Sequence, residues 1–429
     1  MAVSSRLRVS ATLDCPSRRL LSCHARPRLY HRSSSTSHST RHREEDRFPN
    51  FATGDYYPVH PGTLYDNRYK VVAKLGFGTT STVWLAQDLK RRLDPLHWLR
   101  PKYTVLKFLT ASASSNATVV GEVASSNQLS TGNPSHLGKQ YLRLPLRTFD
   151  LWWSGRKYPC LVQEPMRESL GSFRRHFPDR CVPRQLIRPV LEILLQGLDY
   201  MHRCCGLIHT DLHPANILVG IEDPAIIEEL LQRVSSIYAG KSSDEHPVYP
   251  SYTFGALRGP PSHPKIADFG LAVDARKKHT HAIQPDRLRA PEVTLGTEWD
   301  AKVDVWSLGV MMWDLLEGHP LFEAREDETG EYSALLHLRE MHALLGPPPR
   351  SLLRRSPYAE VLYDDKGLLR DAPLPVEEKD LANTVTKLDG EDKVEFLRIM
   401  RKMLQWDPDD RPSAAELLED PWMKSLRAS

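Results

Sequence analysis

Few cysteines and no long apolar run are present in this chain, and these absences exclude two classes of protein. The 429 residues include six cysteines, and none of them forms a CxxC pair. This count excludes a small disulfide-stapled extracellular scaffold, and we expect reduced thiols inside a cell. No apolar run approaches the roughly 18–20 residues of a membrane-spanning helix. We therefore expect a soluble protein with no membrane partner.

Neither sign of charge dominates the sequence. Lys and Arg number 57 against 54 Asp and Glu, for a net charge of +3, so we expect no direct binding of nucleic acid. Residues 1–50 differ from the rest because they are rich in Arg and Ser, and Asp14 is the only acid before Glu44. We interpret them as a disordered tail. A transit peptide and a phosphorylated regulatory segment are the alternative interpretations.

The rest of the chain changes from strand patterns to helix patterns. "RYKVVAKLGFGTTSTVWLAQD", "YTVLKFL" and "YPCLVQEPM" favour strands, and "SNATVVGEVASSNQL" favours a short helix. After them, "RPVLEILLQGLDYMH", "VDVWSLGVMMWDLLEG" and "DKVEFLRIMRKMLQWDP" have helical spacing. Strands followed by helices predict an α+β fold with a sheet-rich small part and a helical large part. Residues 220–264, with the helical "EDPAIIEELLQRV", are interpreted as a surface insertion.

The first candidate site feature is a glycine-containing turn, "LGFGTTSTV", at residues 75–83. Gly76 and Gly78 let a backbone approach a ligand closely, and the N–H groups of such a turn can bind phosphates. Ser81 stands where a third glycine is usual, so the motif is incomplete. Alone, it is equally compatible with an ordinary hairpin.

A lysine in an apolar strand is the second feature. Lys107 in "TVLKF" would be costly to bury unless its charge is paired. Glu122, on the following predicted helix, is the candidate partner, and phosphate oxygens could share the lysine. The alternative is an edge lysine whose amino group reaches water.

Two further stretches carry an Asp and an Asn that could serve phosphoryl transfer. In "HTDLHPAN", Asp211 could accept or orient a hydroxyl proton. Asn216 and, in "KIADFG", Asp268 could offer the oxygen ligands that Mg²⁺ prefers. Each signal is modest, but their order along the chain leaves little room for chance.

With the motifs in this order, residues 68–425 of the chain resemble the protein kinase family. "RAPEV", "DVWSLG" and "DPDDRPSAAELLEDPW" agree, and the resemblance pairs Arg411 with Glu292. "YYPVHPGTLYDNRYKVVAKLGFGTTSTVWLA", "HTDLHPANIL" and "IQPDRLRAPEV" are more narrowly similar to the SR-protein kinases and their fungal relatives. The resemblance implies a bilobal protein kinase-like fold, with a small β-rich N-lobe at 51–163, a hinge at 164–168, and a larger helical C-lobe at 169–425 that contains the insertion.

The resemblance also implies ATP and Mg²⁺ between the lobes. The catalytic residues would be Asp211, Lys107, Glu122 and His213, and the metal ligands Asn216 and Asp268. The nucleotide would contact Leu75, Gly76, Gly78, Val83, Lys107 and the hinge backbone of Glu164 and Met166, with Gln163 controlling access behind the base. We expect a monomer that phosphorylates Ser or Thr in proteins, including Ser in Arg-Ser segments. The expected location is cytoplasm or nucleus, with mitochondria as the alternative from the N-terminal tail.

Two residues depart from the usual kinase pattern. Thr210 replaces the Arg that in many kinases binds a phosphorylated activation loop, so we expect activity without that phosphorylation. His213 replaces the Lys that contacts the transferred phosphate. An imidazole carries only part of a positive charge at neutral pH, so we expect a slower enzyme; alternatively, His213 merely holds the loop by a hydrogen bond.

Two rival functions and one surface feature stay open. "HTDLHPAN" also resembles the loop of aminoglycoside and choline phosphotransferases, although those lack an APE segment, and a catalytically silent scaffold is the other alternative. The acidic stretch "FEAREDETGEY", residues 322–332, could attract Arg-rich peptides. A solvated acidic loop is the simpler interpretation of that stretch.

Overall fold

The structure is a computed structural model of the chain. It describes residues 54–90, 102–111, 117–238, 249–326, 329–364, 366–370 and 379–427. All of the described residues belong to one compact unit. The expectations for the N-terminal tail lie outside the described residues.

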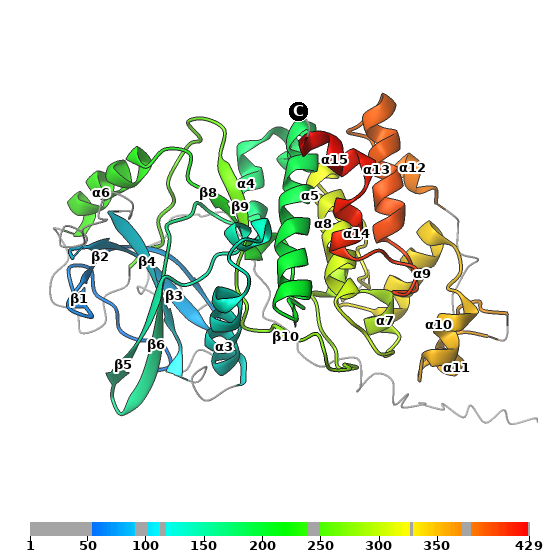
Figure 1. The fold of residues 1–429 in the computed structure, drawn as a ribbon, viewed down its shortest axis with the longest axis horizontal. Helices are drawn as coiled ribbons and strands as arrows, with labels where there is room; N and C mark the ends of the chain where they lie inside the picture. The colour runs from blue at the N-terminus through cyan, green and yellow to red at the C-terminus, as the bar shows by residue number, and fades with distance from the viewer. Residues whose placement is uncertain are drawn as a thin grey trace, which may run out of the picture. The chain divides into compact units, whose positions relative to one another are not determined.

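A six-stranded antiparallel sheet forms the N-lobe, with the strand order β1-β2-β3-β4-β6-β5 (Figure 1). Its strands are β1 (Leu64–Tyr65), β2 (Tyr69–Gly78), β3 (Ser81–Asp88), β4 (Tyr103–Leu109), β5 (Arg147–Trp153) and β6 (Arg156–Gln163). The predicted strand "YTVLKFL" is β4, and it is buried along its whole length. Helix α3 (Ala117–Thr131) packs on the sheet through Val123, which contacts Leu109 and Leu161.

Helices dominate the C-lobe, as the periodicity predicts. They are α4 (Leu170–Phe173), α5 (Arg184–Asp199), α7 (Pro291–Thr294), α8 (Lys302–Glu317), α9 (Ala334–Leu345), α10 (Arg350–Arg355), α11 (Ala359–Leu362), α12 (Leu381–Thr384), α13 (Gly390–Met403), α14 (Ala414–Leu418) and α15 (Pro421–Arg427). Helix α8 is buried on nearly every side. At Gly309, an added Cβ would lie 3.1 Å from the Cβ of Met403, so glycine allows α8 and α13 to pack closely.

Two short antiparallel pairs position the loops that carry the candidate site. β7 (Leu207–Ile208) pairs with β10 (Val273–Asp274), and β8 (Ile217–Gly220) pairs with β9 (Ser262–Ile266). The segment "HTDLHPAN" lies between β7 and β8, and Asp268 follows β9 directly. These pairings bring the two loops to the same edge of the C-lobe.

The insertion is more than a surface loop. Its helix α6 (Ala225–Tyr238) follows β8 in the chain but packs against the N-lobe sheet (Figure 1). Ile226 and Leu230 are buried in one apolar cluster with Ala73 and Leu85. The apolar residues of α6 recur at helical spacing, so they form one face that an isolated surface helix would leave in water. The insertion therefore connects the two lobes.

The expectations about membrane-spanning helices and about reduced cysteines can be compared with the residues that the structure describes. None of its helices combines the length and apolar composition that crossing a bilayer requires. The four cysteines that the structure describes, Cys160, Cys181, Cys204 and Cys205, are all free thiols.

Candidate active site

An ion pair inside the N-lobe links the strand lysine to helix α3. The Nζ atom of Lys107 donates to Oε1 of Glu122 at 2.6 Å, and both side chains are buried. The same Nζ lies 3.7 Å from Oδ1 of Asp268. Burial by itself lowers the pKa of Lys107, but the charges of Asp268 and Glu122 outweigh it and hold that pKa above its ordinary value. The lysine is therefore a cation directed toward the loop after β9.

A buried carboxylate on α8 holds the loop that contains Asp211. The two oxygens of Asp304 accept hydrogen bonds from the backbone N–H of His209 at 2.7 Å and of Thr210 at 2.9 Å. His202 also contacts Asp304, at 2.9 Å. Thr210 has a φ of 67°, in the left-handed region that non-glycine residues rarely adopt. The two N–H bonds to Asp304 hold the backbone in this conformation.

Within that loop, the side chains of Asp211, Asn216 and His213 lie together. Nδ2 of Asn216 donates to the backbone oxygen of Asp211 at 2.9 Å and to its Oδ2 at 3.3 Å. The Nε2 of His213 lies 3.7 Å from Asp211 Oδ2, while its Nδ1 accepts from the N–H of Ala215. Because Nδ1 is an acceptor, the proton of a neutral imidazole is on Nε2, the nitrogen that faces Asp211.

Hydrogen bonds next to Asp268 join this loop to the lysine cluster. Ala267 donates its N–H to the backbone oxygen of Asn216 at 2.8 Å, and its own oxygen contacts Nε2 of His209 at 3.2 Å. Asp268 follows immediately and has a φ of 66°. The structure thus brings the predicted Lys107, Glu122 and Asp268 into one cluster. Asp211, Asn216 and His213 form a second cluster, which is joined to the first through the bond between Ala267 and Asn216.

The glycine turn is a hairpin between β2 and β3. Gly76 pairs with Val83, and Gly78 pairs with Ser81. A Cβ added at either glycine would meet no protein atom within 4 Å. The packing of the protein therefore does not require glycine at these positions, and a role in binding a ligand stays a prediction. Leu75 and Val83 are partly buried on the same hairpin.

The predicted hinge follows β6 and is held from the C-lobe side. The carboxylate of Glu164 pairs with Nζ of Lys265 on β9 at 2.5 Å. Met166 is buried, and the next residue, Arg167, donates its N–H to the oxygen of Val219 on β8 at 2.8 Å. These bonds fix the hinge backbone against the pair β8–β9.

Sequence reasoning missed the buried cation Arg143 at this place. Arg143 lies between α3 and β5 and donates from a terminal nitrogen to the backbone oxygen of Glu164 at 3.0 Å. The available signal was a charged residue within "YLRLPL", similar to the signal that identified Lys107. Its partner is a backbone carbonyl, which leaves no trace in the pattern of side chains.

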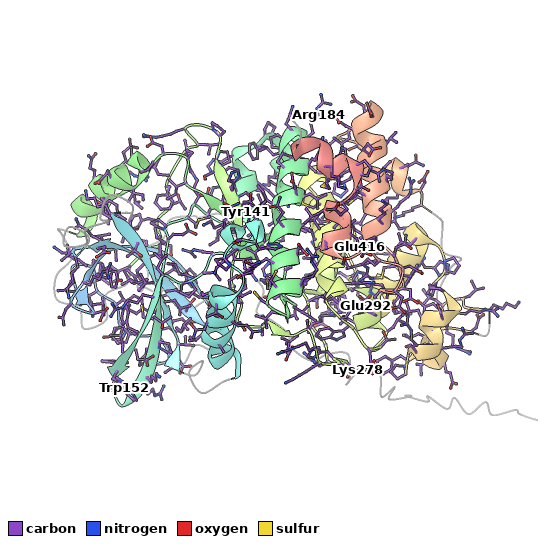
Figure 2. All side chains as sticks on the ribbon, in the orientation of Figure 1. Tyr141, Trp152, Arg184, Lys278, Glu292 and Glu416 are labelled. Carbon is purple, nitrogen blue, oxygen red and sulfur yellow. The ribbon has the colours of Figure 1, made fainter. Side chains whose placement is uncertain are left out.

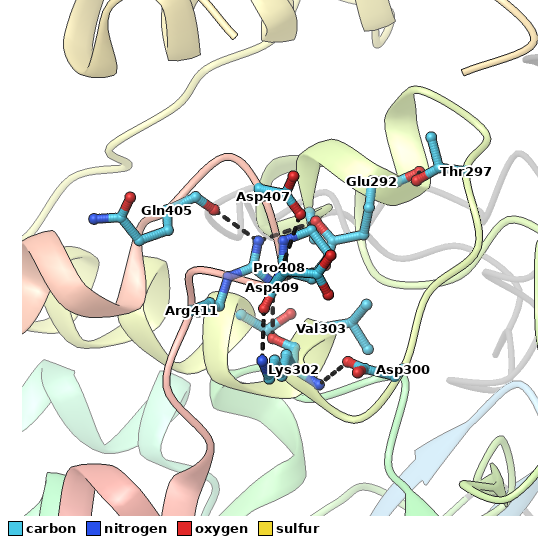
Figure 3. Close-up of polar contacts among 12 residues, drawn as sticks. Glu292, Thr297, Asp300, Lys302, Val303, Gln405, Asp407, Pro408, Asp409 and Arg411 are labelled. Atoms are coloured by element: carbon cyan, nitrogen blue, oxygen red, sulfur yellow. Dashed lines mark hydrogen bonds and ion pairs between the residues drawn. The ribbon is translucent and has the colours of Figure 1, made fainter. Parts of the chain in front are cut away.

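The predicted pair of Glu292 and Arg411 is present and fully buried (Figure 3). The guanidinium donates to both carboxylate oxygens, at 2.7 and 3.0 Å, and to the carbonyl oxygens of Lys302 and Gln405. Glu292, which is labelled in Figure 2, belongs to α7. This pair anchors the APE segment to the end of the C-lobe.

The acidic stretch 322–332 is only partly described, because Asp327 and Glu328 lie outside the described residues. Glu323 is not free, since its Oε2 pairs with Arg287 at 2.7 Å. Glu326 and Glu331 join through a backbone hydrogen bond of 3.0 Å. The docking role of this stretch stays a prediction.

The arrangement offers a fixed cation, a carboxylate near an imidazole, and free oxygen ligands. Because Nδ2 of Asn216 is bonded to Asp211, its side-chain oxygen is left for a cation, and the side chain of Asp268 is 47% exposed. Oxygen ligands of this kind fit Mg²⁺. Among the described residues, His, Cys, Asp and Glu form no group of three that could hold a metal alone, so a metal here would need ligands besides these side chains.

Comparisons with known proteins show the family of the chain. The family model for the protein kinase domain matches residues 69–423. A serine/threonine protein kinase of Aspergillus fumigatus is 35% identical over 384 residues, which cover 89% of this chain and 90% of that protein. The serine/threonine-protein kinase SRPK of Physarum polycephalum is 28% identical over 411 residues, covering 89% and 92%.

A solved crystal structure of a kinase domain has the same fold. It aligns with a TM-score of 0.61 at 22% identity, covering 86% of this chain and 99% of that domain. The bilobal α+β fold is thus confirmed. The chain belongs to the protein kinase family and is an ATP-dependent serine/threonine protein kinase, similar to the SR-protein kinases.

Proposed function

We propose that the chain transfers the γ-phosphate of Mg-ATP to Ser or Thr of protein substrates through the residues described above. The observation that carries this assignment is Lys107, which is bonded to Glu122 and turned toward Asp268. In this proposal Lys107 binds nucleotide phosphates, and Asp211 orients the substrate hydroxyl and accepts its proton. The base lies between Leu75 and Val83 and contacts the backbone of Glu164 and Met166, with Gln163 behind it.

Asn216 and Asp268 would hold Mg²⁺ together with the phosphates. When bound, the ion neutralises charge on the phosphate oxygens. The glycine hairpin would lie over the same phosphates, with Gly76 and Gly78 allowing the backbone to come close. The open space at both glycines supports this role.

His213 would act on the transferred group through its Nε2–H. The acceptor role of Nδ1 directs this N–H toward the side of Asp211. A neutral N–H donor stabilises phosphate charge less than a lysine ammonium does. Replacing His213 by Lys should therefore raise kcat several-fold at neutral pH, whereas an unchanged kcat would leave His213 only a loop-holding role.

Activity without activation-loop phosphorylation is part of the proposal. Thr210 donates its hydroxyl to the oxygen of Leu271 at 2.8 Å, and the N–H of Gln284 donates to the oxygen of Thr210 at 3.1 Å. These bonds connect the loop to the segment 271–289 without any phosphate. Phosphatase treatment of the purified protein should leave activity nearly intact, and a large loss would contradict this part.

Ser in Arg-Ser segments is the proposed substrate. The support is similarity to the SRSF protein kinase 3 of Mus musculus, 23% identical over 524 residues, and the acidic stretch 322–332. Replacing Glu326 and Glu331 by Lys should raise KM for an Arg-Ser peptide and spare a neutral Ser peptide. Equal effects on both peptides would remove the docking role. A monomeric state and a cytoplasmic or nuclear location stay predictions.

The central experiment measures phosphate transfer from labelled Mg-ATP to an Arg-Ser peptide, a neutral Ser peptide and small alcohols. We expect transfer to peptides only, and Asp211→Asn should reduce kcat about 100- to 10,000-fold. Transfer to small alcohols would favour a small-molecule phosphotransferase. Nucleotide binding without any transfer would favour a silent scaffold.

A further inference from the structure

Arg143 is a buried arginine at the hinge that has no carboxylate of its own. It follows a 3₁₀-helix, Leu137–Tyr141, which packs against β9 and α5; Tyr141 marks this place in Figure 2. Its backbone N–H donates to the oxygen of Ile266 at 2.8 Å, and the residue is only 8% exposed. One terminal nitrogen donates to the backbone oxygen of Glu164 at 3.0 Å.

One nitrogen of this guanidinium is buried without a hydrogen-bond partner. An arginine has five N–H donors, yet Nε of Arg143 is buried without a partner, and within the described residues Arg143 forms no ion pair. Glu122 is already paired with Lys107, and Glu164 with Lys265. Burial lowers the pKa of Arg143 to about 10, opposed by Glu164 and Glu122, so it is still a cation at neutral pH. Both carboxylates are shared with a lysine, so this buried cation has no counter-charge of its own, which is unfavourable for the protein alone.

A second polar group without a partner belongs to the residue before Glu164. Gln163, the residue before Glu164, is 4% exposed, and its Oε1 is buried without a hydrogen-bond partner. The rear of the proposed nucleotide pocket thus combines a guanidinium donor, an amide that can donate or accept, and the carbonyl of Glu164. A pocket that bound only adenine, whose 6-amino group is a hydrogen-bond donor, would not need a second donor that carries a positive charge at this position.

The purine bases differ at the 6-position, which the hinge carbonyl would contact. Adenine has a 6-amino donor, which suits the oxygen of Glu164. Guanine and hypoxanthine have a 6-oxo acceptor beside an N1–H donor. The N–H of Arg143 next to the oxygen of Glu164 is a donor beside an acceptor, which complements that 6-oxo edge. The hydrogen bond between Arg143 and Glu164 keeps the two groups adjacent.

We propose that Arg143 allows the pocket to bind 6-oxopurine nucleotides, GTP and ITP, in addition to ATP. This inference depends on the nucleotide site of the proposed function. Arg143 acts as a specificity-determining residue that donates to the 6-oxo group, and Glu164 accepts from N1–H. ITP lacks the 2-amino group of GTP, so it isolates the contribution of the 6-position.

The test measures dissociation constants of ATP, GTP and ITP with Mg²⁺ by calorimetry on the full chain. The unchanged protein should bind GTP and ITP within about tenfold of ATP. Arg143→Met should weaken GTP and ITP by about 10- to 100-fold, the contribution of a hydrogen bond to a charged group, and change ATP less than threefold. Arg143→Lys, which keeps a donor, should give an intermediate loss.

Arg174→Met is the matched control, because the guanidinium of Arg174 also donates to backbone oxygens, those of Arg180 and Gly318, but in the C-lobe. It should leave the ratio of GTP to ATP affinity unchanged. ATP binding with no GTP or ITP binding by the unchanged protein would overturn the proposal, even if Arg143→Met failed to fold. An equal effect of Arg143→Met on all three nucleotides would also overturn it. Failure to bind any nucleotide would overturn the proposed function as well.

Discussion

Arg411 in the C-lobe and Arg143 at the hinge are both buried, but their surroundings differ. Arg411 donates to both oxygens of Glu292 and to two backbone carbonyls, and its guanidinium lies over the ring of Trp306. Arg143 donates to one carbonyl and has no carboxylate. The first cation has a carboxylate partner within the protein, whereas the second has none at ion-pair distance, and Nε of each is buried without a hydrogen-bond partner. The comparison separates charges that maintain the fold from charges that are available to a ligand.

Lys107 lies between these two cases. It has a buried carboxylate partner in Glu122, but its second carboxylate, Asp268 at 3.7 Å, is half-exposed. A charge at an active site can thus be paired for stability and still be directed toward a ligand. All three cations are buried, and the number and exposure of their carboxylate partners are what distinguish them.

The largest expected effect on stability comes from breaking the buried ion pair of Arg411 and Glu292. Arg411→Met leaves Glu292 as a buried charge without a partner, so it should lower the free energy of unfolding by about 3–5 kcal/mol. Urea denaturation followed by tryptophan fluorescence measures it. The double variant Arg411→Met with Glu292→Leu should recover most of the loss, because no charge is then left buried. A loss below about 1 kcal/mol in the single variant would contradict the comparison.

Asp304 extends the comparison to a buried carboxylate with complete partners. Burial by itself raises its pKa, but the hydrogen bond and charge of His202, with the N–H of His209, hold the pKa below its ordinary value. Because the folded pKa is depressed, the carboxylate stabilises the fold above the unfolded pKa of about 3.9, and that stabilisation is lost as pH falls through the folded pKa.

Asp304→Asn should therefore cost about 1–3 kcal/mol of unfolding free energy at pH 7, and the difference from the unchanged protein should shrink below about pH 4. Denaturation at a series of pH values measures this. Asp300→Asn is the control, because Asp300 is exposed and only caps the N–H of Lys302. A difference that is constant with pH would show that the charge of Asp304 is not what matters.

Arg143→Met should have a smaller effect, of opposite sign to that of Arg411→Met. Removing a buried cation that has no carboxylate of its own relieves a desolvation cost, while one hydrogen bond to Glu164 and the attraction of Glu164 and Glu122 are lost. We expect the free energy of unfolding without nucleotide to stay unchanged or rise by about 1 kcal/mol. A loss comparable to that of Arg411→Met would assign Arg143 to the fold rather than to the ligand.

The features with local signals could be predicted from the sequence, and those that depend on distant partners could not. Lys107 was identifiable because a charge interrupts an apolar strand, and Asp211, Asn216 and Asp268 because they occur beside short strands in a fixed order. Arg143 was missed because it bonds to a backbone carbonyl. The N-lobe contact of α6 was missed because Ala73 and Leu85 are far away in the chain and carry no mark of their partner.

The smallest effect should come from the exposed pair between α6 and the N-lobe. Lys102 and Glu228 lie 2.6 Å apart with nearly half of each side chain in water, and the hydroxyl of Tyr103 also donates to Glu228. Exposed ion pairs contribute about 0.2–1 kcal/mol and weaken with salt, so Glu228→Gln should change the unfolding free energy by less than about 1 kcal/mol, and by still less in 1 M salt. Leu230→Ala, which instead removes buried contacts of the same helix, should cost about 2–5 kcal/mol. If the two variants were equally destabilised in denaturation experiments, the attachment of α6 would be electrostatic. The distinction between buried and exposed partners would then not hold at the surface.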